Sequence, residues 1–410
     1  MDTAFVLTHL ATNPTPAAVR PTPAASQKPV SSLPLATAAG TGLVSYPQPG
    51  ENPFARGEAR HMFKPERCNE CGDCLVGCMF NEYTRERAVA ERRALNAGEW
   101  APILHDCASC HACNEFCPEG ANPWDLVSHL QSVYGEVSTA NVWGERALRV
   151  DEARRNLQVD HLPERSDTVL ATCTVGDLDP GAFDSALYAG LTKLTGPEYY
   201  CCNALEYFGD EEGSRARAQG FVDALNRHRP KEVVCYHDAC YFHLTYRLPE
   251  YGVEVPFRPV HLFEYLLRFV QAHPDRVRPL GMKIAYQRPC SSRNAEDKEP
   301  YLDELLAAIG VERVPRRYDR ANALCCGDVL SFRGLQDRAE DAALGNIADA
   351  REHGAGAMAY LCPSCLKLYG RLGPQHGLGV YHVSELCRLA LGEEPAGAVS
   401  NRATPRPGRM

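Results

Sequence analysis

The stretch Ala323-Leu324-Cys325-Cys326-Gly327 places two cysteines side by side. Two neighbouring side chains cannot easily reach one tetrahedral zinc ion, and a disulfide between them would be strained. Cys290 precedes this pair, and Cys362-Pro363-Ser364-Cys365 follows it at a similar distance. Five thiolates from three segments are one more than an ordinary four-iron cubane needs. The stretch therefore predicts a larger or more open iron–sulfur site.

The composition limits what the rest of the chain can be. Its 410 residues are 44% hydrophobic and 23% charged, which suffices for two or three domains with cores. The net charge of −9 argues against a nucleic-acid-binding protein. No apolar run is long enough for a membrane span, and the first residues lack the positive region of a signal peptide. We expect a cytoplasmic protein that meets a membrane, if at all, through a partner.

Nineteen cysteines are the most informative part of the composition. In a long chain with C-x-x-C spacings they indicate metal binding more than disulfides. Two runs upstream share the spacing C-x2-C-x2-C-x3-C, in which the fourth cysteine ligates the cluster of the other run. We assign the first [4Fe–4S] cluster to Cys68, Cys71, Cys74 and Cys117, and the second to Cys107, Cys110, Cys113 and Cys78. The alternative for these runs is a pair of zinc knuckles.

Helical segments are expected around the two runs. Residues 84–97 combine strong helix formers with an N-capping Thr84, and Pro123 begins another helix. The arginines of the first helix would form either a solvated face or a partner-docking surface. A further helix over residues 144–157 would bridge this region to the second half of the chain.

The second half contains the same series of landmarks twice, which indicates duplicated domains. The matching segments are 167–173 with 282–290, Cys201-Cys202 with Cys325-Cys326, 232–241 with 358–366, and 261–266 with 382–387. Each copy reads as strand, helix, cysteine pair, helix, strand, cysteine loop and helix, so each should be a small α/β domain. Cys387 falls in an amphipathic helix and is expected in the core.

The two copies differ at one ligand position. The first copy has His237 where the second has Cys362. The candidate metal ligands of the first copy are Cys173, Cys201, Cys202 and Cys240, with either His237 or Cys235 as a fifth. Imidazole ligates iron in some clusters. Two alternatives remain open: a further cluster in the first copy, or a decayed repeat whose cysteines pack as core residues.

These patterns predict a fold of the α+β or α/β class, in which a helical dicluster ferredoxin domain precedes two duplicated cysteine-rich α/β domains. The predicted divisions are a disordered Ala/Pro-rich segment 1–58, a ferredoxin domain 59–135, a helical linker 136–165, the first cysteine-rich unit 166–275, the second cysteine-rich unit 276–392 and a disordered tail 393–410.

A helical dicluster ferredoxin followed by two "CCG" cysteine-rich domains resembles the heterodisulfide-reductase-related iron–sulfur proteins. These include the iron–sulfur subunits of glycolate oxidase and anaerobic glycerol-3-phosphate dehydrogenase. The resemblance covers roughly residues 60 to 392. It implies a noncubane [4Fe–4S] cluster in the second unit, with a catalytic role, held by Cys290, Cys325, Cys326, Cys362 and Cys365. His237 departs from the family pattern in the first unit.

This architecture is compatible with two redox functions and with a third function that needs no redox chemistry. The chain is expected to be either an electron-transfer subunit of an oxidoreductase or a catalytic disulfide reductase acting at the 290–365 site. A zinc-stabilised interaction scaffold is the third alternative. No G-x-G-x-x-G follows an expected strand, so any flavin or NAD would belong to a separate subunit. Expected partners in a hetero-oligomer are a flavin-containing or other dehydrogenase subunit, or a membrane quinone or cytochrome subunit.

Overall fold

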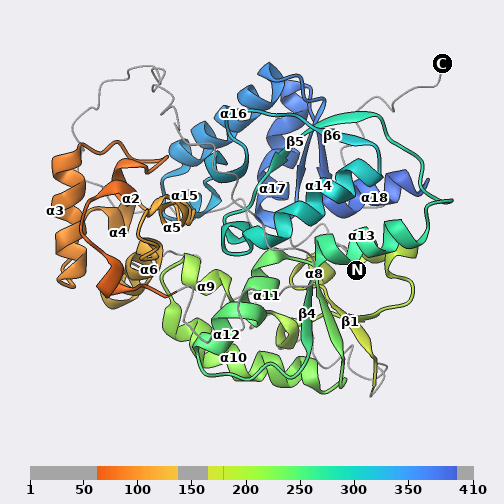
Figure 1. The fold of residues 1–410 in the computed structure, drawn as a ribbon, viewed down its shortest axis with the longest axis horizontal. Helices are drawn as coiled ribbons and strands as arrows, with labels where there is room; N and C mark the ends of the chain where they lie inside the picture. The colour runs from red at the N-terminus through yellow and green to blue at the C-terminus, as the bar shows by residue number, and fades with distance from the viewer. Residues whose placement is uncertain (1–61, 137–164, 179, 395–410) are drawn as a thin grey trace, which may run out of the picture. The chain divides into compact units, whose positions relative to one another are not determined.

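The computed structural model describes residues 62–136, 165–178 and 180–394. These residues form a mixed α/β structure with two parallel four-stranded sheets (Figure 1). This confirms the predicted fold class. The predicted disordered segment 1–58, nearly all of the helical linker 136–165 and of the tail 393–410 lie outside the described residues. The domain boundaries stay predictions.

Residues 62–136, which we call the ferredoxin-like region after its cysteine spacing, are helical. Their α-helices are α2 (Asp73–Val76), α3 (Arg85–Asn96), α4 (Ile103–Asp106), α5 (Ala112–Phe116) and α6 (Pro123–Val133). As predicted, Thr84 caps α3, because its hydroxyl accepts a hydrogen bond from the Arg87 backbone N–H at 3.3 Å. Leu95, Leu104 and Leu130 bury the inner faces of these helices against one another.

The first sheet belongs to the first cysteine-rich unit. Its strands are β1 (Thr168–Ala171), β2 (Thr192–Leu194), β3 (Glu232–Cys235) and β4 (Arg258–His261), in the order β2-β1-β3-β4. The helices around it are α8 (Val175–Leu178), α9 (Ala204–Tyr207), α10 (Glu211–Asn226), α11 (Asp238–Phe242), α12 (Leu248–Glu250) and α13 (Leu262–Ala272).

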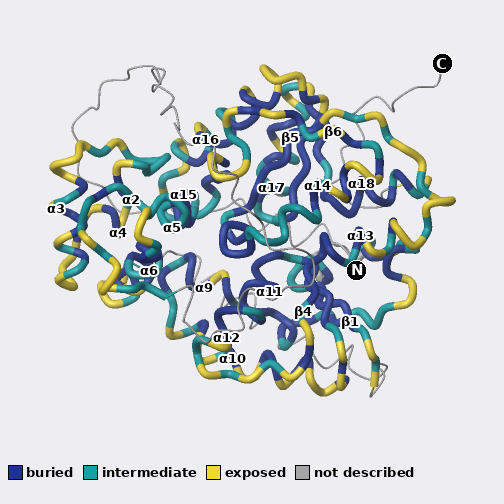
Figure 2. Tube along the Cα trace, viewed as in Figure 1, coloured by how far each residue is buried: buried dark blue, intermediate teal, exposed yellow. Residues whose placement is uncertain are grey.

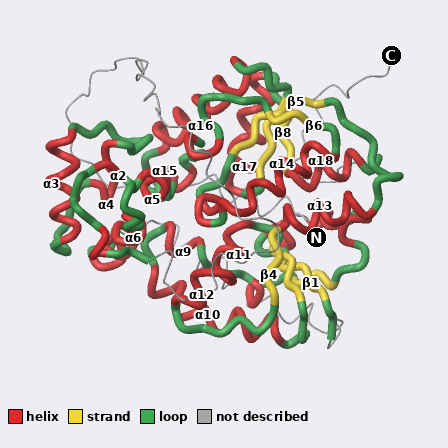
Figure 3. The backbone as a smooth tube through the Cα atoms, in the orientation of Figure 1, coloured by secondary structure: helices red, strands yellow, loops and turns green. Residues whose placement is uncertain are grey.

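The second sheet repeats this arrangement. Its strands are β5 (Met282–Gln287), β6 (Val311–Arg313), β7 (Ala357–Tyr360) and β8 (Gly379–His382), in the equivalent order β6-β5-β7-β8. Its helices are α14 (Glu299–Ala308), α15 (Asp328–Phe332), α16 (Gln336–Glu352), α17 (Pro363–Leu372) and α18 (Val383–Ala390). The sequence pattern predicted only the two central strands of each sheet. The edge strands (Figure 3) each contain one buried aliphatic residue, so no apolar run marks them in the sequence.

The parallel arrangement decides where the cysteines lie. Carboxyl ends of parallel strands meet at one edge of a sheet, and ligands commonly bind there. Cys173 follows β1, and Cys240 lies on α11, just after β3. Cys290 follows β5 and Cys362 follows β7 in the same way. Each sheet therefore presents its cysteines at its carboxyl edge.

A shared hydrophobic core joins the two sheets. Leu170 and Val234 of the first sheet, with Ile284 of the second, belong to one cluster of fully buried side chains. Cys387 is fully buried in this cluster, as predicted. Figure 2 shows buried positions along the strands and exposed ones on outer helices such as α3 and α10. Among the helices of the described ranges, none is long and apolar enough to span a membrane.

Candidate metal centres

The two ferredoxin-like runs wind their loops in the same way. The residue before the second cysteine is left-handed in both, with φ of 60° at Glu70 and 50° at Ser109. The residue after the second cysteine is left-handed too, with φ of 78° at Gly72 and 61° at His111. These turns follow from the C-x2-C-x2-C spacing, which must fold three thiols back toward one point.

The fourth cysteine of each run lies near thiols of the other run. Burial raises the pKa of Cys71 and Cys74, and the nearby thiol of Cys117 adds to the rise of both. Burial also raises the pKa of Cys107 and Cys110, and the neighbouring Cys78 adds to each. The structure thus brings together the two sets that the spacing assigned. The ligand roles themselves stay a prediction.

N–H groups point at the sulfur atoms of these sets, as expected for iron–sulfur thiolates. The donors to sulfur are Ser109 N to Cys107 at 3.3 Å, Ala121 N to Cys117 at 3.4 Å, Asn81 Nδ2 to Cys78 at 3.4 Å and Asn96 Nδ2 to Cys68 at 3.3 Å. Buried Arg92 donates to the side-chain amide oxygen Oδ1 of Asn96 at 2.9 Å, so it orients one of these donors. The residues present fit iron–sulfur ligation, and the number of clusters stays a prediction.

The five cysteines of the second unit form a continuous chain of hydrogen-bonded thiols. The order of contacts is Cys290, Cys325, Cys326, Cys365 and Cys362. Hydrogen bonds from Cys290 and Cys326 hold the pKa of Cys325 well below its usual range. The five thiols that the sequence selected therefore meet, as a row of successive contacts, at the carboxyl edge of the second sheet.

The backbone around the Cys325-Cys326 pair is held in place by buried polar side chains. Gln287 and Asn346 both donate to the Leu324 carbonyl oxygen, at 2.8 and 3.0 Å. Gly327 follows the pair with φ of 79°, and a Cβ there would lie 3.0 Å from the backbone of Ala339 on α16. Both its backbone conformation and the close approach of α16 favour glycine at this position.

His237 contacts the second unit, although it belongs to the first. Its imidazole hydrogen-bonds to Cys362, and its Nε2 lies 3.0 Å from Asp238 Oδ1. Burial lowers the pKa of His237, but Asp238 and Cys362 outweigh it and raise that pKa to about 9. Hydrogen bonds from Cys365 and then His237 lower the pKa of Cys362 to about 5.

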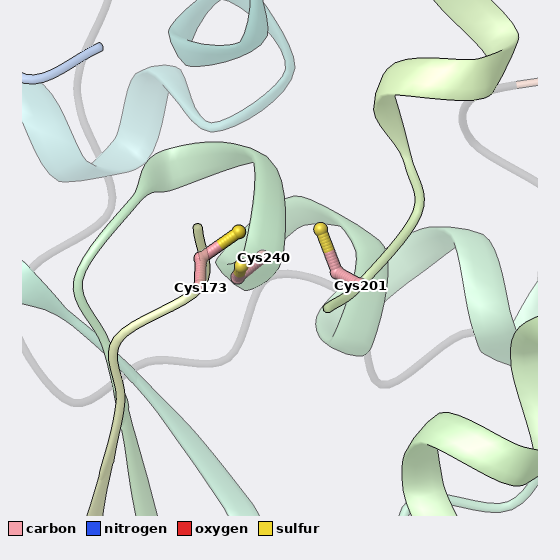
Figure 4. Close-up of side chains that lie close together, drawn as sticks. All are labelled: Cys173, Cys201 and Cys240. Atoms are coloured by element: carbon pink, nitrogen blue, oxygen red, sulfur yellow. The ribbon is translucent and has the colours of Figure 1, made fainter. Parts of the chain in front are cut away.

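The first unit brings three thiols together. Sγ atoms of Cys173, Cys201 and Cys240 all lie within 4.8 Å of one another, and Figure 4 shows them pointing into a shared space. The other two candidate cysteines of this unit donate to backbone carbonyl oxygens: Cys202 to Tyr200 at 3.5 Å, and Cys235 to Val233 at 3.7 Å.

The ferredoxin-like region contacts the second unit at its cysteine site. Cys110 packs into the same apolar cluster as Cys325 and Cys326. Glu115, between two ferredoxin-like cysteines, pairs with Arg288 at 2.7 Å and also with Arg293. The spacing analysis missed these three charged residues. Their closeness in sequence to the cysteines could have identified them, because each lies within three residues of a candidate ligand.

A second buried ion pair joins the ferredoxin-like region to the first unit. Arg247 of the first unit contacts Asp125 of α6 at 2.6 Å and Glu206 at 2.9 Å. Ser109 also donates to the Tyr207 carbonyl oxygen at 2.8 Å. Both cysteine-rich units are therefore attached to the ferredoxin-like region through a buried arginine and an acidic partner.

Comparison with known families gives one match. A family model described as CCG, a cysteine-rich domain, matches residues 284–367, which include all five cysteines of the second site. No curated protein matches the chain. The family match, together with the gathered cysteines, supports a metal-binding iron–sulfur protein.

Proposed function

We propose that this chain is the iron–sulfur electron-transfer subunit of an oxidoreductase complex. In this function, electrons pass between the ferredoxin-like region and the cysteine site of the second unit. When bound, iron–sulfur clusters supply one-electron transfer at potentials set by charge, exposure and hydrogen bonds to sulfur. The observation that carries the proposal is the packing of Cys110 against the buried cluster that contains Cys325.

The contact is close enough for the two thiols to affect each other. Burial raises the pKa of Cys110, and the charge of Cys325 is the next largest cause of the rise. Arg293 lies near both thiols and lowers both pKa values. It also donates to the carbonyl oxygens of Ala321, at 3.0 Å, and Ala323, just before the cysteine pair. Packed side chains and hydrogen bonds thus connect the ferredoxin-like region to the second cysteine site.

The chain's own residues hold both ends of this contact together. Glu115 is fixed between Arg288 and Arg293, and the two arginines lie on either side of Cys290. Pairing neutralises charges that would otherwise be buried alone. In this function the remaining redox partner, a flavin-containing dehydrogenase subunit or a membrane quinone or cytochrome subunit, belongs to another chain.

Electron paramagnetic resonance on the anaerobically purified, reduced chain tests the proposal. We expect the signals of the ferredoxin-like region and of the second site to broaden or split one another, because the two sites are in contact. The Cys325→Ser/Cys326→Ser variant should remove this interaction and leave the ferredoxin-like signals unsplit. Signals that relax independently in the unmodified chain would contradict the direct path.

A catalytic disulfide reductase is the second candidate, and the row of five thiols favours it. An open site with one thiolate more than a cubane needs has room for a sulfur ligand. The two functions are separated by turnover. If the purified chain, given a strong one-electron donor, reduces thiol disulfides without a partner, the disulfide-reductase function replaces the carrier function.

A further inference from the structure

Each of the two ferredoxin-like cysteine sets has one sulfur that accepts a hydrogen bond from an asparagine held by an arginine. We call the set next to the second cysteine site the proximal set and the other the distal set. The proximal set is Cys78, Cys107, Cys110 and Cys113, and the distal set is Cys68, Cys71, Cys74 and Cys117. The two supporting arginines come from different parts of the chain.

In the distal set the support is local. Asn96 Nδ2 donates to Cys68 Sγ at 3.3 Å, and Arg92 donates to Asn96 Oδ1 at 2.9 Å. Arg92 and Asn96 both lie on α3, within the ferredoxin-like region. A helix of this region therefore orients the amide donor of its own distal set.

In the proximal set the equivalent support comes from the second cysteine-rich unit. Asn81 Nδ2 donates to Cys78 Sγ at 3.4 Å. Arg338 of α16 donates from Nη2 to Asn81 Oδ1 at 2.8 Å and to the Phe80 carbonyl oxygen at 2.6 Å. Arg338 Nη1 also lies 3.8 Å from Asp106 Oδ1, so a carboxylate balances its charge. Arg338 therefore acts on Cys78 through the amide that it holds.

A second arginine of the same unit lies beside the proximal set. Leu330 of α15 is fully buried in one cluster with Ala108, the residue after Cys107. Arg333 directly follows α15, and its Nη1 donates to the carbonyl oxygen of Leu104, just upstream of Cys107, at 3.3 Å. Burial raises the pKa of Cys107, and the charge of Arg333 opposes this rise. The guanidinium is thus near a proximal thiol.

No carboxylate of the described ranges forms an ion pair with Arg333. Its Nη1 binds backbone carbonyl oxygens, the second being that of Glu136 at 3.4 Å. Its Nε and Nη2 are buried and have no hydrogen-bond partner in the part of the chain that the structure describes. A buried charge with unused N–H donors calls for an anionic neighbour. Four thiolates around a [4Fe–4S] core make such a neighbour.

We infer that the second cysteine-rich unit sets the reduction potential of the proximal set, through the charge of Arg333 and through the hold of Arg338 on Asn81. Both arginines favour the reduced state, because each stabilises negative charge on the sulfurs. Neither is a ligand, so both are positioning residues. The inference rests on the proposed function for the presence of clusters. It adds that the unit at one end of the electron path controls the set that precedes it.

A redox titration of the anaerobically purified full chain, followed by electron paramagnetic resonance, tests this inference. Arg333→Gln removes the unbalanced charge, so the ratio of reduced to oxidised cluster at the proximal set should fall about tenfold at a fixed potential, equivalent to about 59 mV. Arg333→Lys keeps the charge and should keep most of the ratio. An equal loss in both variants would show that the charge is not the cause.

The effect of Arg338 should be smaller, because Asp106 already balances its charge. Arg338→Gln should lower the same ratio about threefold, the value of one modest hydrogen bond. Added to Asn81→Ala, it should cause little further change, because it acts through that amide. Arg351→Gln is the matched control: Arg351 is exposed on the same helix, about 20 Å along its axis, and its loss should leave the ratio unchanged.

Two asparagine variants show which signal belongs to which set. Asn81→Ala should shift the proximal signal and Asn96→Ala the distal one, because each removes the amide donor of one set. The arginine variants support the inference if they shift the signal that Asn81→Ala shifts. Arg338 is partly exposed, so Arg338→Gln decides the question even if Arg333→Gln loses iron.

Two results would overturn the inference and leave the proposed function intact. In the first, the arginine variants shift only the signal that Asn96→Ala shifts. In the second, with full iron and sulfide content, they shift neither signal more than Arg351→Gln does. Absence of any iron–sulfur signal from the unmodified chain would overturn both the inference and the proposed function.

Discussion

The two cysteine-rich units share a sheet order but not a ligand set. Both have the same parallel strand order, and both carry their cysteines at the carboxyl edge. The second unit gathers five thiols in a row, whereas the first gathers three in a compact group. Cys173 has φ of 51°, whereas its counterpart Cys290 has φ of −59°. Duplication thus preserves the place of a site, while the backbone conformation of individual loop residues decides which ligands reach it.

The strongest test of this difference removes the cysteine pair of each unit. Cys325→Ser/Cys326→Ser should abolish one paramagnetic species and lower the iron content by about one cluster, because two of five ligands are lost. The ferredoxin-like signals should remain. Cys387→Ser, which changes a buried cysteine of the same unit far from the row in sequence, serves as the control. Cys201→Ser/Cys202→Ser should not lower the iron content, and a drop there would erase the distinction between the units.

The next largest effect is expected from removing the ion pairs that attach each unit to the ferredoxin-like region. Glu115→Ala removes the carboxylate that Arg288 and Arg293 share and leaves Arg288 only its pair with Glu299, so the free energy of unfolding should fall by about 3 kcal/mol. The matched change in the first unit is Asp125→Ala, which removes one partner of Arg247. Thermal unfolding should show both losses. Only Glu115→Ala should also alter the paramagnetic signal of the second site. The same change of that signal in both variants would contradict the view that Glu115 attaches the second unit and Asp125 the first.

A single variant tests whether His237 influences the cysteine site of the second unit or that of the first unit, to which it belongs. His237→Ala removes a hydrogen bond and a positive charge from Cys362, so the potential of the second site should fall by roughly tens of millivolts. The iron content of the chain should not change. His243→Ala, which changes another buried histidine of the first unit, is the control for volume. A loss of iron in His237→Ala would show that His237 ligates or supports a cluster.

The helix-capping histidines of the two units should respond to pH alike. Nδ1 of His261 and of His382 accepts a backbone N–H at the start of α13 and α18, at 3.2 Å in both. Burial lowers their pKa to about 3 and about 4, although Asp238 opposes this and His237 adds to it. The folded rings stay neutral, whereas the unfolded ones take up protons near pH 6.5.

Stability is therefore lost as the pH falls below that value. Each ring should cost about 1.4 kcal/mol between about pH 7.5 and about pH 5.5. Asparagine caps helices without titrating, so His261→Asn and His382→Asn should each flatten the dependence of the unfolding temperature on pH. Comparing each variant with the unmodified chain cancels the contribution of the metal sites. An unchanged slope in either variant would show that its cap does not titrate as described.

Much of this arrangement follows from short-range pattern. The two C-x2-C-x2-C-x3-C runs, the capped helix α3 and the central strands each depend on residues close together in the chain. The duplication was also visible, because its landmarks recur in the same order. Arg92 is an example of a residue whose position the local sequence pattern did not predict. It belongs to a helix whose arginines were expected to form a surface face, yet it is buried and holds Asn96, a donor to Cys68.

The sequence by itself determined which residues could be ligands and that they would lie at the ends of strands. Only the tertiary structure decided which of them meet. His237 aligns with a cysteine of the second unit in the repeat, but the packing of the two units turns it toward Cys362. Cys202 lies next to Cys201, but a left-handed backbone turns its thiol away. The reason is physical: spacing limits local loops, whereas convergence at a site depends on dihedral angles and on packing between distant segments.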